Sequence, residues 1–359
     1  MTTTGKAPSS ALTSFVVASR YLPVYLAILV LVVVASIWAP ATLQRSGLTA
    51  VSLFGSFLAI TALGQMMVIM TGGIDLSVPG TFTLGAIVMV GVGQQSDDRV
   101  WIALFAATGL AALIGLVNGL LIGGLKLNPL IVTLAVGQVV TGLVNRYHKT
   151  FAIQSSVPPA LPAWLNQPLF GESTPSWIPF SRIFWTSVVL TALLIIGFRF
   201  TTAGRRFQAV GANPVASHVV GLRVNVNQIA AYVIAGVLYA IAGVLISALL
   251  RNPGVTIGAP YLLGPIAAVV IGGASLTGGL ASPLSTWSAA FFLAGLNQMM
   301  RVMGLPTALQ FVVFGSVIIG GMLVSGDRII KGIEQLLRER RRDRRQDADP
   351  GQGPAEAPA

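Results

Sequence analysis

The chain has 359 residues, of which 54% are hydrophobic and only 9% are charged, and its mean hydropathy is +0.80. Because a soluble domain has about 25% charged residues, this composition excludes an ordinary soluble protein and predicts an all-α integral membrane protein. The formal net charge is +11, but the basic residues lie at the ends of apolar runs and in the C-terminal tail, which is typical of membrane proteins rather than of nucleic-acid-binding proteins.

The chain begins with a small, polar segment, residues 1–20, which we expect to be a cytoplasmic tail. The first apolar run, 21–39, ends at small residues that could mark the cleavage site of a signal peptide. However, the run is longer than the roughly 7–15 residues of a signal-peptide core, and many more apolar runs follow it. We therefore expect an uncleaved first membrane helix.

Ten apolar runs are each about long enough to cross a bilayer core of roughly 30 Å, and they predict about ten transmembrane helices within residues 21–325. Two runs, 79–93 and 262–273, are short and could be half-membrane segments that are backed by protein. The runs are 21–39, 47–70, 79–93, 101–123, 129–144, 183–199, 226–250, 262–273, 283–303 and 306–324.

An even number of spans places both termini on the same side of the membrane. With the N-terminus inside, fifteen of the 22 basic residues fall on the cytoplasmic side and seven on the other, but eight of those fifteen belong to the tail after residue 325. The positive-inside rule therefore predicts cytoplasmic termini mainly from this tail and from the basic segment 204–224.

The longest external loop on this orientation is 145–182, which contains six prolines together with Trp164 and Trp177. Proline prevents a regular helix, and tryptophan suits the membrane–water interface. Two interpretations stay open: a stiff connector that rests on the membrane, or a periplasmic landing surface for a soluble partner. At the other end, the tail 326–359 is basic and then disordered in composition, and we assign it no catalytic role.

The segment 70–80, MTGGIDLSVPG, contains Asp75, the only acidic residue before residue 95. Burying a carboxylate costs several kcal/mol unless it is hydrogen-bonded. Gly72 and Gly73 allow the backbone to turn near it, and Ser77 could cap the following helix. Asp75 therefore either ties a helix break together, as a cap, or lines a path or gate through the membrane.

A similar pattern occurs near the C-terminus, where residues 72–77 match 272–277 in spacing, including Gly272 and Gly273. A second similarity pairs 115–118 with 295–297, at a different offset. An internal repeat of the kind found in transporters and chance similarity between glycine-rich membrane segments both remain open.

Polar residues within the apolar runs are candidates for the lining of a path, because neutral amides and hydroxyls can hydrogen-bond sugar hydroxyls. They can equally hydrogen-bond one helix to another. Since this set lacks charge, it argues against ion transport. The set consists of Gln65, Asn118, Thr133, Gln138, Asn297, Gln298 and Gln310.

The segment 204–224 is a basic island in an otherwise apolar chain and contains Arg205, Arg206 and Arg223 but no acidic residue. We expect a turn at Gly211, Asn213 and Pro214, with Asn213 capping a short helix and Pro214 at its first position. Gly221 suits the end of this helix. The segment is interpreted either as a cytoplasmic loop that retains positive charge or as a helix on which a soluble partner docks. The apolar residues available to such a partner are Val215, Val219, Val220 and Leu222.

Three motifs, MTGGIDLSVPG (70–80), GRRFQAVGANPVASHVVGL (204–222) and VVIGGASLTGG (269–279), together resemble the permease subunits of ribose-type ABC sugar importers. The resemblance covers residues 48–324. It implies a permease that moves a monosaccharide, such as a ribose-like pentose, a hexose or a related polyol, across the inner membrane. Pro79 is a departure, because the family more often has glycine there.

The resemblance also implies partners and site residues. The partners are a cytoplasmic ABC ATPase, a periplasmic sugar-binding protein and a second permease copy or paralogue, while ATP and Mg would bind only to the ATPase. In the family, the loop 200–225 carries the coupling helix, which assigns to ATPase coupling Arg205, Arg206, Gly211, Asn213, Pro214, Val219 and Gly221. The expected path or gate residues are Gly72, Gly73, Asp75, Ser77, Asn118, Gln138, Gly272, Gly273, Asn297 and Gln298.

The sequence contains neither a G-x-x-x-x-G-K-[ST] phosphate loop nor a nucleophile–base–acid set, and it has no Cys. Its two histidines, His148 and His218, lack nearby carboxylates, so a metal site is not expected. An intramembrane enzyme is therefore disfavoured, and ATP hydrolysis would require a separate chain. The main alternative is a secondary transporter or facilitator for a small neutral solute, which would not need a docking helix; a structural scaffold is a further alternative.

Overall fold

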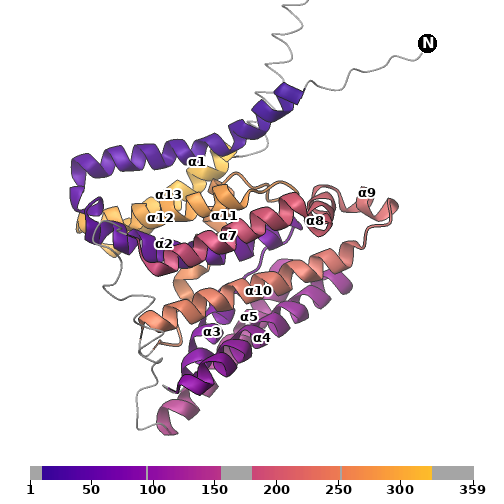
Figure 1. The fold of residues 1–359 in the computed structure, drawn as a ribbon, viewed down its shortest axis with the longest axis horizontal. Coiled ribbons are helices and arrows are strands. Elements are labelled where there is room, and N and C mark those ends of the chain that lie inside the picture. The colour runs from indigo at the N-terminus through magenta and orange to yellow at the C-terminus, as the bar shows by residue number, and fades with distance from the viewer. Residues whose placement is uncertain (1–9, 94–95, 155–179, 251–252, 326–359) are drawn as a thin grey trace, which may run out of the picture.

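The structure is a computed structural model that describes residues 10–93, 96–154, 180–250 and 253–325 (Figure 1). Within these ranges, helices are joined by turns and no strand occurs, which confirms the predicted all-α fold class. The helices are α1 (Ser10–Trp38), α2 (Arg45–Met70), α3 (Val78–Gly93), α4 (Val100–Gly119), α5 (Pro129–Gln154), α7 (Arg182–Phe200), α8 (Thr202–Ala212), α9 (Pro214–Val219), α10 (Val224–Leu249), α11 (Gly264–Ile271), α12 (Pro283–Val302) and α13 (Thr307–Ser325). Single turns form η1 (Pro40–Thr42), η2 (Asp97–Arg99), η3 (Leu120–Gly124) and η4 (Ala259–Tyr261).

Each of the ten predicted apolar runs overlaps one of α1 to α5, α7 or α10 to α13. Within the described residues, six helices are long and apolar enough to cross a membrane, namely α1, α2, α4 with its continuation η3, α5, α7 and α10. Shorter apolar helices lie at Val78–Gly93, Ala259–Ile271 and Ala308–Gly321. The positions of the runs are therefore confirmed, whereas a total of about ten spans stays a prediction.

Two predicted boundaries differ from the structure. Helix α1 begins at Ser10, inside the expected tail, because residues 10–20 contain neither glycine nor proline to stop it. Helix α5 continues to Gln154, inside the expected loop 145–182, because the first proline of that loop is Pro158. Residues 155–179 of the loop, with both tryptophans, and the tail 326–359 lie outside the described residues.

Helix α2 is at the centre of the fold, and every residue from 55 to 70 is buried. It contacts α7, α10, α11 and α12. The short helix α3 is similarly buried and contacts α4, α5 and α10. Figure 1 shows α10 between these two groups, with α3, α4 and α5 on one side and α2, α11, α12 and α13 on the other.

The close packing of these helices depends on small residues, as is usual in membrane proteins. A Cβ atom at Gly64 of α2 would lie 2.6 Å from Cε1 of Tyr239 on α10. About one turn further along α10, Gly243 contacts the carbonyl oxygen of Phe82 on α3 so closely that no side chain fits. Helix α10 can therefore lie against α2 and α3 at once.

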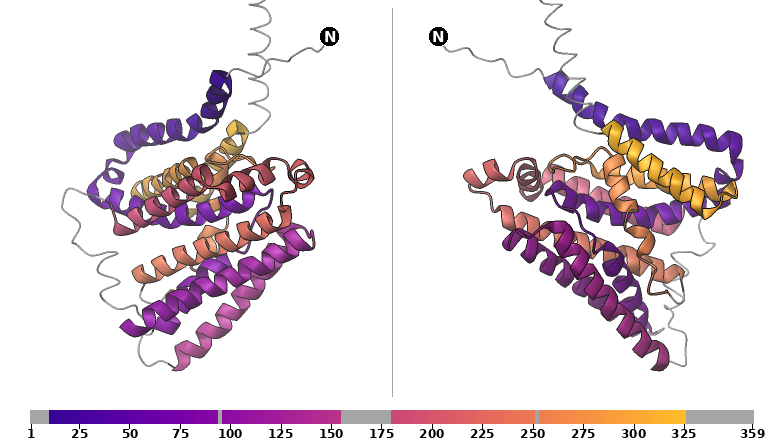
Figure 2. Two further views of the ribbon diagram at one scale, coloured as in Figure 1. Left: turned by 45° about the vertical axis from the view of Figure 1, so that its right-hand side comes forward. Right: turned by 180° about the vertical axis from the view of Figure 1, so that it is seen from behind.

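The outward faces of α1, α4, α5 and α7 carry large apolar side chains that are more than half exposed, such as Leu29, Phe105, Ile131 and Leu193. Figure 2 shows α1 at one edge of the molecule and α4 with α5 at the opposite edge. Extended apolar surfaces of this kind suit contact with lipid or with another membrane chain.

Candidate functional site

Three segments that are far apart in the sequence meet where α2 ends. The carbonyl oxygen of Met70 accepts a hydrogen bond of 2.9 Å from the amide of Gly279, in the turn after α11. Gly211, in the last turn of α8, lies against the same oxygen, and a Cβ atom there would overlap it. Gly278 and Gly279 have φ angles of +100° and +90°, which favour glycine. We call Met70, Gly211 and Gly279 the three-motif junction, because each belongs to a different one of the three motifs.

The break that follows α2 has the geometry of a helix C-cap. Gly72 has a φ of +81°, and the amide of Gly73 donates to the carbonyl of Val68, five residues earlier. The break after α11 repeats this pattern, with a φ of +83° at Gly273 and a bond from the amide of Ala274 to Val269. This is the Schellman motif, in which the left-handed residue is usually glycine.

The predicted register of the possible repeat is therefore wrong by one residue. Gly72 is equivalent to Gly273, whereas Gly272 has a negative φ of −66° and lies one position earlier. The same closing pattern occurs at Gly221, where the amide of Leu222 donates to Ser217. Helix α12 ends in this way too, with a φ of +68° at Gly304 and a bond from the amide of Leu305 to Met300. Because four helices share this cap, it is local chemistry and does not establish a duplication.

Asp75 is buried within the break between α2 and α3. One carboxylate oxygen, Oδ1, accepts hydrogen bonds from the Ser77 amide (2.8 Å) and from the Ser77 hydroxyl (2.6 Å). Asn118 of α4 donates from Nδ2 to the Ser77 hydroxyl at 3.0 Å. Ser77 therefore links Asp75 to α4, and the expected cap of α3 by the Ser77 side chain is not seen among the described contacts. This arrangement ties the break together, as the structural interpretation of Asp75 requires.

The backbone of the break is held by side chains of α2 and α5. In the amide orientation that pairs both of its ends, Gln65 of α2 binds the backbone nitrogen (3.1 Å) and oxygen (3.2 Å) of Asp75 and the Tyr239 hydroxyl (2.9 Å). Thr133 of α5 accepts from the Leu76 amide at 2.9 Å. These bonds compensate for the backbone bonds that a broken helix lacks inside a membrane protein.

The polar residues predicted to line a path consequently lie in four different places. Gln65, Asn118 and Thr133 are buried in this bonding network. Gln138 points away from it, because it is exposed on the outward face of α5, and its assignment to the path is not supported by this position. Gln310 donates to the carbonyl of Leu305 at 2.8 Å. Asn297 lines a pocket at the other end of the molecule, and Gln298 bonds to Arg301 of the same pocket.

The basic segment forms two helices rather than a turn and one helix. Helix α8 is amphipathic, since Phe207 and Val210 are buried while Arg205 and Arg206 are exposed. Gly211 therefore lies inside a helix, and the expected turn at this residue is wrong: the position favours glycine because of the contact with Met70. The turn is confined to Asn213.

The short helix α9 has the predicted caps. Asn213 Oδ1 accepts from the Ala216 amide at 2.9 Å, Pro214 occupies the first helical position, and Gly221 follows with a φ of +81°. Ser217 ties α9 to α8 through a bond of 2.9 Å to the carbonyl of Ala209. The exposed side of α9 is apolar, with Val215, Val219 and Val220 at 76%, 81% and 75% exposure. Such exposure in three neighbouring valines marks an interaction surface.

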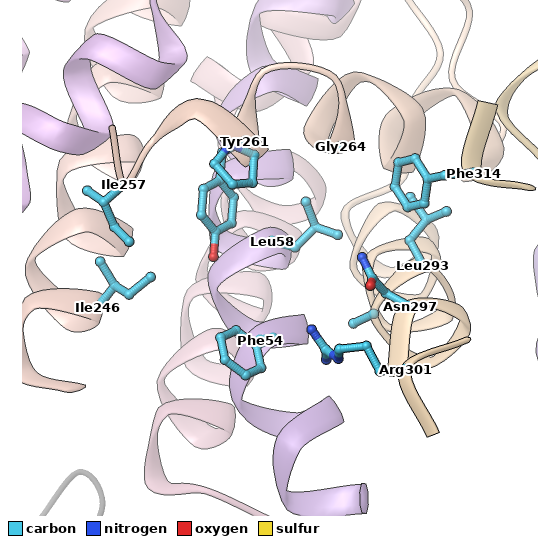
Figure 3. Close-up of a pocket in the computed structure, with 12 residues that line it drawn as sticks. Phe54, Leu58, Ile246, Ile257, Tyr261, Gly264, Leu293, Asn297, Arg301 and Phe314 are labelled. Atoms are coloured by element: carbon cyan, nitrogen blue, oxygen red, sulfur yellow. The ribbon is translucent and has the colours of Figure 1, made fainter. Parts of the chain in front are cut away.

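A pocket of about 270 Å³ opens at the end of the fold opposite α8 and α9 (Figure 3). It lies between α2, α10, η4, α11, α12 and α13. Asn297 lines it, and the assignment of Asn297 to a path stays a prediction. Gln298 Oε1 accepts bonds of 2.7 Å and 3.2 Å from the guanidinium of Arg301, the single charged residue among the described lining residues. The lining residues are Phe54, Leu58, Ile246, Ile257, Pro260, Tyr261, Gly264, Leu293, Ala294, Asn297, Arg301 and Phe314.

Phe54, Tyr261 and Arg301 are not among the site residues predicted from the sequence. Cζ of Arg301 lies 5.4 Å from the centre of the Phe54 ring, a cation–π distance. Tyr261 is stacked on Phe82 with ring centres 4.3 Å apart, which fixes its orientation. A charged residue in an otherwise uncharged apolar run was the available signal for Arg301, whereas two aromatic residues among many carry no such signal.

The fold and the bonded helix breaks define a multi-pass helical membrane protein with two separate polar regions. A family model described as "Branched-chain amino acid transport system / permease component" matches residues 47–322. The chain belongs to this family of permease components, and the resemblance to ABC sugar-importer permeases drawn from the three motifs is confirmed. It is thus a transport subunit. No solved structure matches the chain.

The chain can be aligned with related permeases over nearly the whole length of each relative. The ribose import permease protein RbsC of Bacillus subtilis is 32% identical over 84% of this chain and 91% of its own length. The galactose/methyl galactoside import permease protein MglC of Escherichia coli is 26% identical over 82% and 91%. The autoinducer 2 import system permease protein LsrC of Klebsiella pneumoniae is 30% identical over 86% and 87%.

Proposed function

We propose that this chain is the transmembrane permease subunit of an ABC importer that moves a monosaccharide, a ribose-like pentose, a hexose or a related polyol, across the inner membrane. ATP hydrolysis takes place in a separate ATPase, and a periplasmic sugar-binding protein delivers the substrate. The ribose, galactose and autoinducer 2 permeases among the relatives support this range of substrates, and this chain itself contains no phosphate loop.

One observation carries the proposal. The segment formed by α8 and α9 exposes valines and arginines on its outer side, while Gly211 on its inner side contacts the end of α2. A partner bound to α9 would therefore push directly on the three-motif junction, beside the break that contains Asp75. A facilitator working without an ATPase has no need of this connection.

On this proposal, α8 and α9 are cytoplasmic and the pocket around Arg301 opens to the periplasm. Both termini are then cytoplasmic. Because the chain has no native cysteine, single-cysteine variants report on orientation directly. His218→Cys, exposed on α9, should be protected from a membrane-impermeant maleimide in intact cells, whereas Ser46→Cys, exposed at the start of α2, should react. The reverse labelling pattern would overturn the assigned orientation.

The central test is association with the ATPase. The full-length chain should co-purify with its cognate ATPase, and hydrolysis in liposomes should rise when sugar-loaded binding protein is added. Val219→Glu places a charge on the exposed face of α9 and should abolish both effects, while Val219→Leu should retain them. If no ATPase co-purifies with the parent chain, the importer assignment fails and the facilitator becomes the better account.

A further inference from the structure

Arg301 faces the pocket from the last turn of α12, and its side chain is exposed there. Phe54, whose ring contacts its guanidinium, lies nine residues after Arg45, where α2 begins, which at about 1.5 Å per residue is about 14 Å along the helix. Charged side chains within membrane helices face water-filled cavities or the protein interior and mark substrate or ion pathways. Because the exposed guanidinium of Arg301 needs water rather than lipid around it, the pocket that it lines is a hydrated cavity.

Several hydrogen-bonding groups face this cavity without a protein partner among the described contacts. Gln298 occupies two of the five N–H donors of Arg301. No hydrogen bond from another described residue reaches the Asn297 amide or the Tyr261 hydroxyl. Figure 3 shows the Arg301 guanidinium extending toward Phe54 and the Tyr261 hydroxyl pointing into the same space. The pocket thus offers hydrogen-bond donors and acceptors from two separate elements, Asn297 and Arg301 of α12 and Tyr261 of η4.

The charge of the pocket selects among ligands of this size. Among the lining residues that the structure describes, Arg301 is the only charged one, and none of them is a carboxylate that would neutralise it. A ligand with one negative charge matches one guanidinium, which pairs with carboxylates in a bidentate manner. A phosphate ester, with a charge of about −1.5 to −2, would be left partly uncompensated by this lining.

We propose that the pocket binds a monosaccharide-sized sugar acid, with the carboxylate on Arg301 and the hydroxyl groups on Asn297 and Tyr261. This inference rests on the proposed function and narrows its substrate class from neutral sugars to sugar monocarboxylates. The volume of about 270 Å³ lies just below the roughly 300–1,000 Å³ of sites for drug-sized ligands, which suits a single sugar ring. Phe54, Leu58 and Ile246 provide the apolar wall against which the carbon skeleton of the sugar packs.

The test compares sugars that differ only in a carboxylate replacing a hydroxymethyl group: D-galacturonate with D-galactose, and D-glucuronate with D-glucose. Binding to the full-length chain in lipid nanodiscs is measured by calorimetry at low salt. At least one acid should bind about tenfold more tightly than its neutral partner, and added salt should weaken binding of the acid only. Tighter or equal binding of both neutral sugars, or binding of none of the four, would overturn the proposal.

Substitutions of Arg301 test whether this residue causes the preference for the acid over the neutral sugar. Arg301→Gln should bring the ratio of acid to neutral affinity close to one, and Arg301→Lys should retain part of the preference. The matched control is Arg199→Gln, because Arg199 also lies in the last turn of a helix and beside an aromatic ring, Phe200, but outside the pocket. An acid preference that survives Arg301→Gln would contradict the assignment.

The result of the sugar-binding experiment can be distinguished from the result of the ATPase association test. If the ATPase co-purifies and is stimulated but neutral sugars bind more tightly, the importer stands and the sugar-acid inference falls. If no ATPase associates but the acid preference depends on Arg301, the inference about the pocket stands and the importer falls.

Discussion

The carbonyl oxygen of Met70 accepts a hydrogen bond from the amide of Gly279 at 2.9 Å, although the two residues are 209 positions apart. This bond joins the break after α2 to the turn after α11. Gly211 of α8 packs on the same oxygen, so that the surface segment α8–α9 and both helix breaks form one connected unit. Any movement of α8 must therefore displace the end of α2, in which every residue from 55 to 70 is buried.

Gly211→Ala should weaken this connection. The added Cβ atom would overlap the Met70 carbonyl oxygen, and overpacking of this kind costs about 1–3 kcal/mol. We expect a lower unfolding temperature and reduced stimulation of the ATPase. Gly142→Ala is the control, because a Cβ at Gly142 on α5 meets no atom within 4 Å. Equal behaviour of the two variants would show that the junction is not tightly packed.

Asp75→Ala should destabilise the break between α2 and α3. It removes the acceptor of two Ser77 donors, and leaving a buried donor unsatisfied costs about 1–3 kcal/mol. Asp98→Ala, an exposed site in the turn before α4, should change stability by less than about 0.5 kcal/mol. Thermal unfolding in detergent and uptake in cells measure the two effects. Normal uptake and stability of Asp75→Ala would remove this residue from the candidate site.

Gln65 and Gln138 were both predicted from the sequence as candidates for the lining of a path. Gln65→Ala and Gln138→Ala distinguish the roles of the two residues. Gln65 is buried and bonded to the Asp75 backbone and to Tyr239, so its loss should lower stability by about 1–3 kcal/mol. Gln138 is exposed on α5, so the same change there should be nearly neutral. A greater loss of transport in Gln138→Ala would restore it as a path residue.

Asn213→Ala should act on coupling rather than on global stability. Loss of an N-cap costs roughly 1 kcal/mol, which is enough to disorder a helix as short as α9 but too little to unfold the protein. We expect the unfolding temperature to be unchanged while ATPase co-purification falls. Asn213→Ser preserves a capping side chain and should retain the association. Full coupling in Asn213→Ala would exclude α9 as the docking helix.

Much of the candidate site was predictable wherever the signal was local. The Asn213 cap, Pro214 and the glycine stop at Gly221 follow from side-chain chemistry within a few residues, and they were predicted correctly. The turn assigned to Gly211 was wrong because a glycine that permits a left-handed backbone and a glycine that permits a close contact look identical in sequence. The position of Met70 beside it decides between them.

The sequence by itself determined the all-α membrane fold class, the positions of ten apolar helices and the family, since these follow from composition and from contiguous motifs. Only the tertiary structure decided that Gln65 is buried while Gln138 is exposed, and that Phe54, Tyr261 and Arg301 surround one pocket. The physical reason is that in a chain so uniformly apolar, hydropathy shows where helices lie but not which face of each helix meets its neighbours. Those faces are selected by close packing at residues such as Gly64 and Gly243, whose contacts come from distant parts of the chain.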